Sequence, residues 1–159
     1  MTLKDTVLQI ARGVMTLPTA PFREHRMREH VLAFCRDRGM RTRVDDMGNV
    51  VATLNPQSHN PVLAFGAHMD HPGFIIEKDA KRGRTTALFY GGVEGEYFKG
   101  AGVRVFTDAG PPHAPGTGEV TAHVTSTRVD RRLHVRRVWL SVDPPSRSLG
   151  TSPVRRGDL

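Results

Sequence analysis

The hydrophobic pattern of this chain changes its period near residue 40, and this change limits what the chain can fold into. Before it, apolar residues recur at helical spacing, which predicts an amphipathic helix over residues 3–16. Prolines in "LPTAPF" interrupt that helix, and a second helix is expected to open at Thr19 or Ala20, with Pro21 in its first turn. Gly39 follows the second helix, where a left-handed C-terminal cap favours a residue without a Cβ.

After this point, short extended runs replace the helical period. "RTRVDDMGNVVATLN" predicts a hairpin that turns at Met47-Gly48-Asn49. The run "PVLAFGAHMD" is apolar throughout residues 62–66, which predicts a strand covered on both faces, and "GFIIEKD" predicts another strand. This order indicates the start of an α/β layer protein. Two helices and a hairpin can cover only part of such a strand, so we expect exposed apolar surface on this half of the chain.

Residues 78–145 predict a small all-β module, a barrel or a sandwich. They contain no helical period, and the loop "TDAGPPHAPGTG" is a strong breaker of regular structure. The β-branched and aromatic runs that predict its strands are "TTALFYGG", "GVRVFTD", "GEVTAHVTS" and "RRVWLSVD".

Composition narrows the class of protein. Hydrophobic residues make up 38% of the chain and charged residues 25%, as in ordinary globular proteins. No apolar run approaches the ~20 residues that a membrane span needs, and the N-terminus does not resemble a secretory signal. The single cysteine, Cys35, excludes an internal disulfide framework and a cysteine-rich zinc cluster. A cytoplasmic location without membrane contact is expected.

The net charge of +7 leaves two interpretations of the C-terminal part open. The arginines form either a solvated face or a surface that neutralises nucleic-acid phosphates. Only Trp139 could stack on bases in this region, which disfavours nucleic acid as a partner. The arginines of residues 128–159 are Arg128, Arg131, Arg132, Arg136, Arg137, Arg147, Arg155 and Arg156.

His68 and Asp70 are the candidate functional residues. Residues at i and i+2 of a strand point to the same side, so the two side chains can meet at the end of the predicted strand. A metal-binding imidazole usually donates its other N–H to a carboxylate or a carbonyl, which fixes its tautomer. The spacing alone leaves a metal site and an ordinary turn both open. His25, His30, His113, His123 and His134 are expected to be surface residues, and Cys35 a small core residue.

Residues 17–77 resemble the N-terminal part of the co-catalytic zinc aminopeptidases, in particular the glutamyl aminopeptidase/endoglucanase-like family that includes the tetrahedral aminopeptidases. "YGGVEGEYFKGAGVRVFTDAG" and "LSVDPPSRSLGTSPVRRGDL" resemble parts of the β-rich domain that this family inserts after the strand. The matching positions of the N-terminal part are Pro18, Thr19, Glu24, Gly39, Asp46, Gly48, Asn49 and His68–Phe74.

The resemblance implies a metal-dependent aminopeptidase that acts on peptide substrates with two divalent metal ions, zinc or cobalt. His68 would be a metal ligand and Asp70 the residue that orients it. The implied fold class is α/β: residues 1–77 start an α/β/α catalytic layer, 78–150 form an inserted all-β domain, and 151–159 start the return to the catalytic domain. In such relatives the β domain mediates subunit association, so a homo-oligomer is expected.

Two departures from the family pattern qualify this expectation. His71 stands where the family commonly has Glu, and it is either an extra ligand or substrate contact or a turn residue. The family's remaining metal ligands and its general base follow the inserted domain, so the chain is expected to be a truncated, inactive fragment with at most one partial metal site. A non-catalytic assembly module and a basic nucleic-acid-binding β domain are the alternatives.

Overall fold

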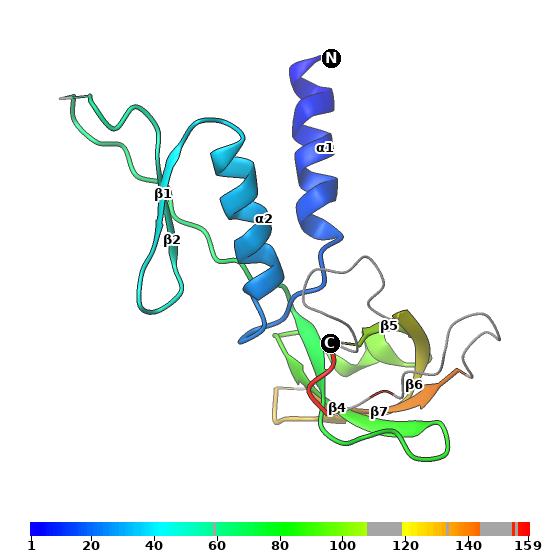
Figure 1. Cartoon of the computed structure of the whole chain (residues 1–159). Helices are drawn as coiled ribbons and strands as arrows, with labels where there is room; N and C mark the ends of the chain where they lie inside the picture. Colours follow the sequence, from blue (N-terminus) through cyan, green and yellow to red (C-terminus); the bar gives the residue numbers. More distant parts are fainter. Residues whose placement is uncertain (59, 108–118, 133, 144–153, 155) are drawn as a thin grey trace. The chain divides into compact units, whose positions relative to one another are not determined.

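The computed structural model describes residues 1–58, 60–107, 119–132, 134–143, 154 and 156–159 (Figure 1). The chain forms two compact units, Met1–Asp70 and His71–Leu159. Most of the predicted loop "TDAGPPHAPGTG", with His113, lies outside the described residues, as do residues 151–153 of the expected return segment. No helix among the described residues is long and apolar enough to cross a membrane.

The first unit begins with two helices, as predicted. Helix α1 spans Leu3–Met15, and the Thr2 hydroxyl and the Asp5 carboxylate cap its first turn reciprocally. Helix α2 spans His25–Arg36, so the predicted start at Thr19 or Ala20 is wrong. Phe22 has a φ of 71°, which breaks the helical path, and its N–H donates to the Glu24 carboxylate at 2.7 Å.

The predicted hairpin is confirmed. Strands β1 (Arg41–Val44) and β2 (Val50–Thr53) pair antiparallel. Gly48 lies in the turn with a φ of 85°, a conformation that glycine adopts without strain. The Asp45 carboxylate stabilises the turn by accepting hydrogen bonds from the backbone N–H groups of Met47 and Asn49.

The predicted strand over residues 62–66 is wrong, although the expected exposure of apolar surface is confirmed. Residues 61–70 form no strand, and the side chains of Val62, Leu63 and Phe65 are 92%, 79% and 90% exposed. A buried strand needs hydrogen-bonding neighbours and covering side chains. The described hairpin strands β1 and β2 pair only with each other, so they provide no such neighbour.

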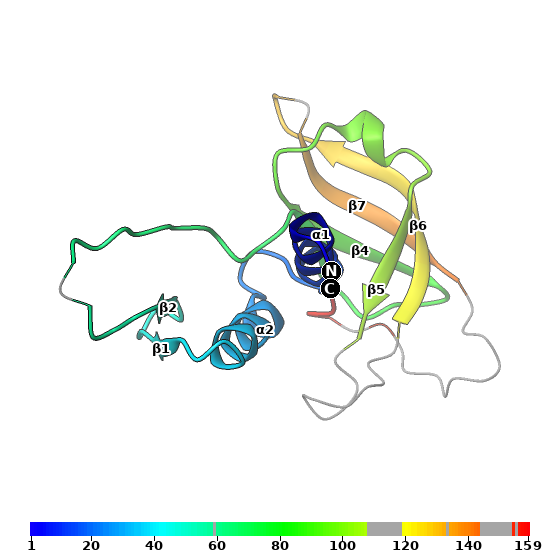
Figure 2. The same cartoon turned by 90° about the horizontal axis from the view of Figure 1, so that it is seen from above.

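The described strands of the second unit form a curled antiparallel sheet, a half-barrel (Figure 2). The strand order is β3-β4-β7-β6-β5. The predicted run "GFIIEKD" and the four runs predicted for the β module all contain strands. A short 3₁₀ helix, η1, precedes β5. The elements are β3 (Gly73–Ile76), β4 (Arg84–Tyr90), η1 (Gly95–Phe98), β5 (Gly102–Phe106), β6 (Glu119–Val129) and β7 (Val135–Val142).

The chain is thus of mixed α/β type, whereas the α/β/α layering stays a prediction. The division at residue 77 also stays a prediction; β3 pairs with β4 inside the second unit.

Both edges of the sheet bind the C-terminal residues. On the β3 edge, the N–H of Ile76 donates to the carbonyl of Asp158 at 2.9 Å. On the β5 edge, Phe106 and Leu159 exchange backbone hydrogen bonds of 2.6 and 3.1 Å. Val154, just before this segment, is buried in the core. The C-terminal residues therefore link the two edge strands.

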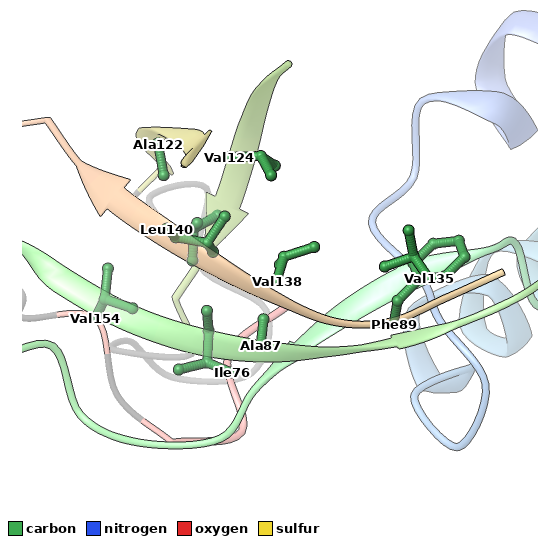
Figure 3. Close-up of a cluster of buried hydrophobic side chains, with 10 residues drawn as sticks. Ile76, Ala87, Phe89, Ala122, Val124, Val135, Val138, Leu140 and Val154 are labelled. Carbon is green, nitrogen blue, oxygen red and sulfur yellow. The ribbon is translucent and has the colours of Figure 1, made fainter. Parts of the chain in front are cut away.

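The inner face of the curled sheet holds the hydrophobic core (Figure 3). Alternate residues of β4 and β7 point inward, as the two-residue period of a strand requires. Phe74, Phe89 and Phe98 meet at one end, with ring centroids 4.9 to 5.3 Å apart. The buried members of the core are Ile76, Ala87, Phe89, Val105, Ala122, Val124, Val135, Val138, Leu140 and Val154.

An ion pair joins β7 to the residue that follows β3. The guanidinium of Arg137 donates two hydrogen bonds of 2.7 Å to the Glu77 carboxylate. These bonds lower the pKa of Glu77 and raise the pKa of Arg137.

We expect Val138→Ala to lower the free energy of unfolding of the second unit by about 2 kcal/mol, because two buried methyl groups are lost and a cavity remains. Val138 is 0% exposed, whereas Val129, in the same sheet, is 39% exposed. Val129→Ala is therefore the matched control, with an expected cost of about 0.5 kcal/mol. Urea unfolding followed by the fluorescence of Trp139, the single tryptophan, measures both; equal costs would contradict this core.

The lowered pKa of Glu77 gives its ion pair a definite pH dependence. The pair stabilises the fold above the unfolded carboxyl pKa of about 4.5, and this contribution is lost as the pH falls through the lower folded value. Glu77→Gln should therefore destabilise the protein at neutral pH, and its difference from the wild type should shrink in acid. Unfolding free energies measured across this range, with the surface change Glu94→Gln as control, would test this; a constant difference would count against it.

Candidate metal-ligand site

His68 and Asp70 are brought together, but on an extended segment rather than at the end of a strand. The His68 Nδ1 atom lies 2.9 Å from the backbone carbonyl oxygen of Asp70 and 3.1 Å from its Oδ1 atom. The His68 side chain is 79% exposed, and that of Asp70 is 32% exposed. The ring therefore faces solvent while one of its nitrogens is held by Asp70.

These two contacts determine which nitrogen of His68 carries the proton. Both oxygens that face Nδ1 are acceptors, so the neutral ring must donate from Nδ1–H. The lone pair then lies on Nε2, on the opposite side of the ring. A metal ion can use this nitrogen, and a second ring nitrogen bound to a carboxylate or carbonyl is the usual companion of such a ligand.

The backbone carbonyl of Asp70 is a second partner of His68. The sequence pattern indicated only the carboxylate, whereas the carbonyl is the closer of the two acceptors. A main-chain contact has no residue-type signal, so only the path of the backbone reveals it. The orientation of the ring depends on both groups.

His71 and Pro72 lead into β3 at the start of the second unit. Pro72 packs against Gly91, since a Cβ placed on Gly91 would lie 2.9 Å from the Pro72 Cβ and 2.8 Å from the Phe89 ring. Gly91 has a φ of 154°, so a side chain there would also strain the backbone. This close packing gives a structural reason for the first glycine of "YGGVEG". His71 itself is half-buried.

The described residues do not fit a complete metal centre. A catalytic zinc takes about three protein ligands and keeps one position open. In the part of the chain that the structure describes, no group of three or more His, Cys, Asp or Glu side chains could hold a metal ion. His123 and Asp143 form a separate pair, with 3.3 Å between Nε2 and Oδ2, but no third ligand among the described residues joins them. His68 thus suits one ligand position, and no catalytic step can be assigned to a metal here.

Comparison with known proteins places this chain, at the level of the family, among the peptide hydrolases. The family model of the M42 glutamyl aminopeptidases matches residues 48–147, more than half of the chain, and the chain belongs to this family. The matched region contains His68, Asp70 and strands β3 to β7. Searches of curated proteins and of solved structures found no match.

The orientation of His68 can be tested by the tautomer of its ring. At a pH where its ring is neutral, we expect nitrogen NMR spectra to show His68 as the Nδ1–H form, because both acceptors face Nδ1. Asp70→Ala removes one acceptor and should increase the share of the Nε2–H form that free imidazole prefers. His71→Ala is the control and should leave the His68 signals unchanged. An Nε2–H tautomer in the wild type would contradict this geometry.

Proposed function

We propose that this chain contributes to a metal-dependent aminopeptidase, with His68 Nε2 as one metal ligand and Asp70 as the group that orients the ring. The family match over residues 48–147 is the observation that carries this proposal. The hydrogen bonds to Nδ1 support it, because they leave Nε2 as the acceptor nitrogen of an exposed ring.

The bound metal ions of such an enzyme would polarise the water and the carbonyl of an N-terminal peptide bond. The part played by the described residues is limited to one ligand and its orientation. The Asp70 carboxylate and carbonyl hold the imidazole in one tautomer, which removes the need to reorder the ring when a ligand binds. The described residues bring no further ligand set together around a metal ion. Zinc or cobalt is the expected metal.

A zinc titration followed by NMR tests the assignment of His68. We expect the His68 signals to respond at lower zinc concentration than those of His25 and His30, because only His68 has a Nδ1 held by two acceptors among these three rings. Asp70→Ala should weaken this binding by roughly tenfold, as the loss of an orienting partner does at other sites. Glu29→Gln serves as a control for the loss of a carboxylate elsewhere in the first unit. Equal responses of all three histidines would overturn the ligand assignment.

The same preparations report on activity. The pure 159-residue chain should not hydrolyse aminoacyl-nitroanilides in the presence of zinc or cobalt. The described residues offer one oriented ligand, and one ligand cannot hold a catalytic ion in place. Robust hydrolysis that His68→Ala abolishes would show that this chain alone assembles a full centre, contrary to the proposal.

A further inference from the structure

Strand β6 pairs with β7 along one side up to its last residue, but along the other side it has a partner only in its first half. β7 pairs with β6 from Ala122 to Val129. β5 pairs only with residues 119–123, and the N–H of Val124 donates to the carbonyl of Ala101. Beyond this point, no backbone hydrogen bond from a described residue reaches the side of β6 that faces away from β7. Residues 125–129 are therefore an open strand edge.

An open edge presents unpaired N–H and C=O groups. In an antiparallel strand, successive residues direct these groups alternately to the two sides, so part of residues 125–129 directs them away from β7. Such groups are a ready template for another extended chain. The ladder also shifts register between Val124 and Ser126, where the Thr125 hydroxyl donates to the Trp139 carbonyl at 3.1 Å. Bulges of this kind often lie next to functional sites.

Residues 125–127 and 129 of β6 line one side of a cleft, and η1 with its flanking residues Glu94 and Lys99 lines the other. The cleft has a volume of about 530 Å³, within the range of ligand-binding sites. Gly95 lets η1 approach β6 closely, since a Cβ there would lie 2.8 Å from Val129 Cγ1. The cleft is lined by Glu94, Gly95, Glu96, Lys99, Thr125, Ser126, Thr127 and Val129.

The charge of the lining indicates which extended chain would fit. Glu94 and Glu96 bring two carboxylates to the cleft, against the single ammonium of Lys99. This local excess of acid stands out in a chain whose net charge is +7. A basic side chain beside the two carboxylates would gain an ion pair, whereas an acidic one would be repelled.

We propose that this cleft binds an extended peptide segment that carries lysine or arginine. The peptide backbone adds to the open edge of β6 at residues 125–129, and a basic side chain lies between Glu94 and Glu96. Strand addition of this type obtains affinity from main-chain hydrogen bonds and specificity from the flanking side chains. The proposal uses no metal ligand and does not depend on the proposed peptidase function.

The test uses the full chain and a short, blocked peptide of alternating lysine and valine. We expect binding to slow amide hydrogen exchange at residues 125–129, because the peptide covers these N–H groups. Methylation of the peptide's backbone nitrogens on the side that pairs should abolish binding, while methylation on the other side should not. Protection elsewhere in the chain, or equal binding of all three peptides, would overturn the proposal.

Variants of the lining test the role of charge. The double variant Glu94→Gln, Glu96→Gln should weaken the binding of the basic peptide by roughly tenfold, and Lys99→Gln should strengthen it. Asp46→Asn, an exposed carboxylate of the first unit, is the matched control and should change nothing. Unchanged affinity in the double variant, with Trp139 fluorescence showing a native fold, would overturn the proposal. A changed oligomeric state in light scattering without a changed peptide affinity would also overturn it, because a second copy would then occupy the cleft.

Discussion

The antiparallel pairing of β7 with β4 on one side and β6 on the other is the constraint on which the second unit depends. β3 is attached to this ladder through β4, and β5 through β6. The ladder also sets which residues enter the core, because the register pairs Val138 with Ala87 and Leu140 with Val124 on the inner face. The C-terminal residues then connect the two edges that the five strands leave. The length over which each strand pairs with its neighbour determines both the core and the cleft beside η1.

The candidate ligand in the first unit rests on a much smaller set of contacts. His68 is oriented by one residue, two positions along the chain, on a segment without regular structure. Local contacts of this kind need no surrounding sheet, which explains how the pair can form although the predicted strand does not. They can fix the tautomer of a ring, but they cannot gather ligands from distant parts of a chain. A complete metal centre therefore needs long-range packing that brings further ligands to the oriented one.

Much of the fold could be predicted from local sequence signals. The five strands of the second unit, the hairpin at Gly48 and helix α1 each depend on the period and turn residues of their own segment. The start of α2 could not be predicted, because the positive φ of Phe22 is uncommon for an aromatic residue and has no sequence signature.

The strand predicted at residues 62–66 was wrong for a related reason. Its apolar side chains predict a strand only where neighbouring strands pair with it and side chains cover it. The described residues supply neither the strands nor the cover. The same limit applies to the site. The spacing of His68 and Asp70 could indicate the carboxylate contact, whereas the carbonyl contact and the open edge of β6 depend on backbone paths that side-chain patterns do not encode.

The exposed segment around Val62, Leu63 and Phe65 affects how the chain is degraded in a cell. Extended, apolar and solvent-accessible backbone is what chaperones bind and what proteases cut. A cut there would fall before His71, where the second compact unit begins, so every strand of the half-barrel would remain on one piece. Chaperones and proteases would thus act first on the first unit, and the second unit would be degraded later.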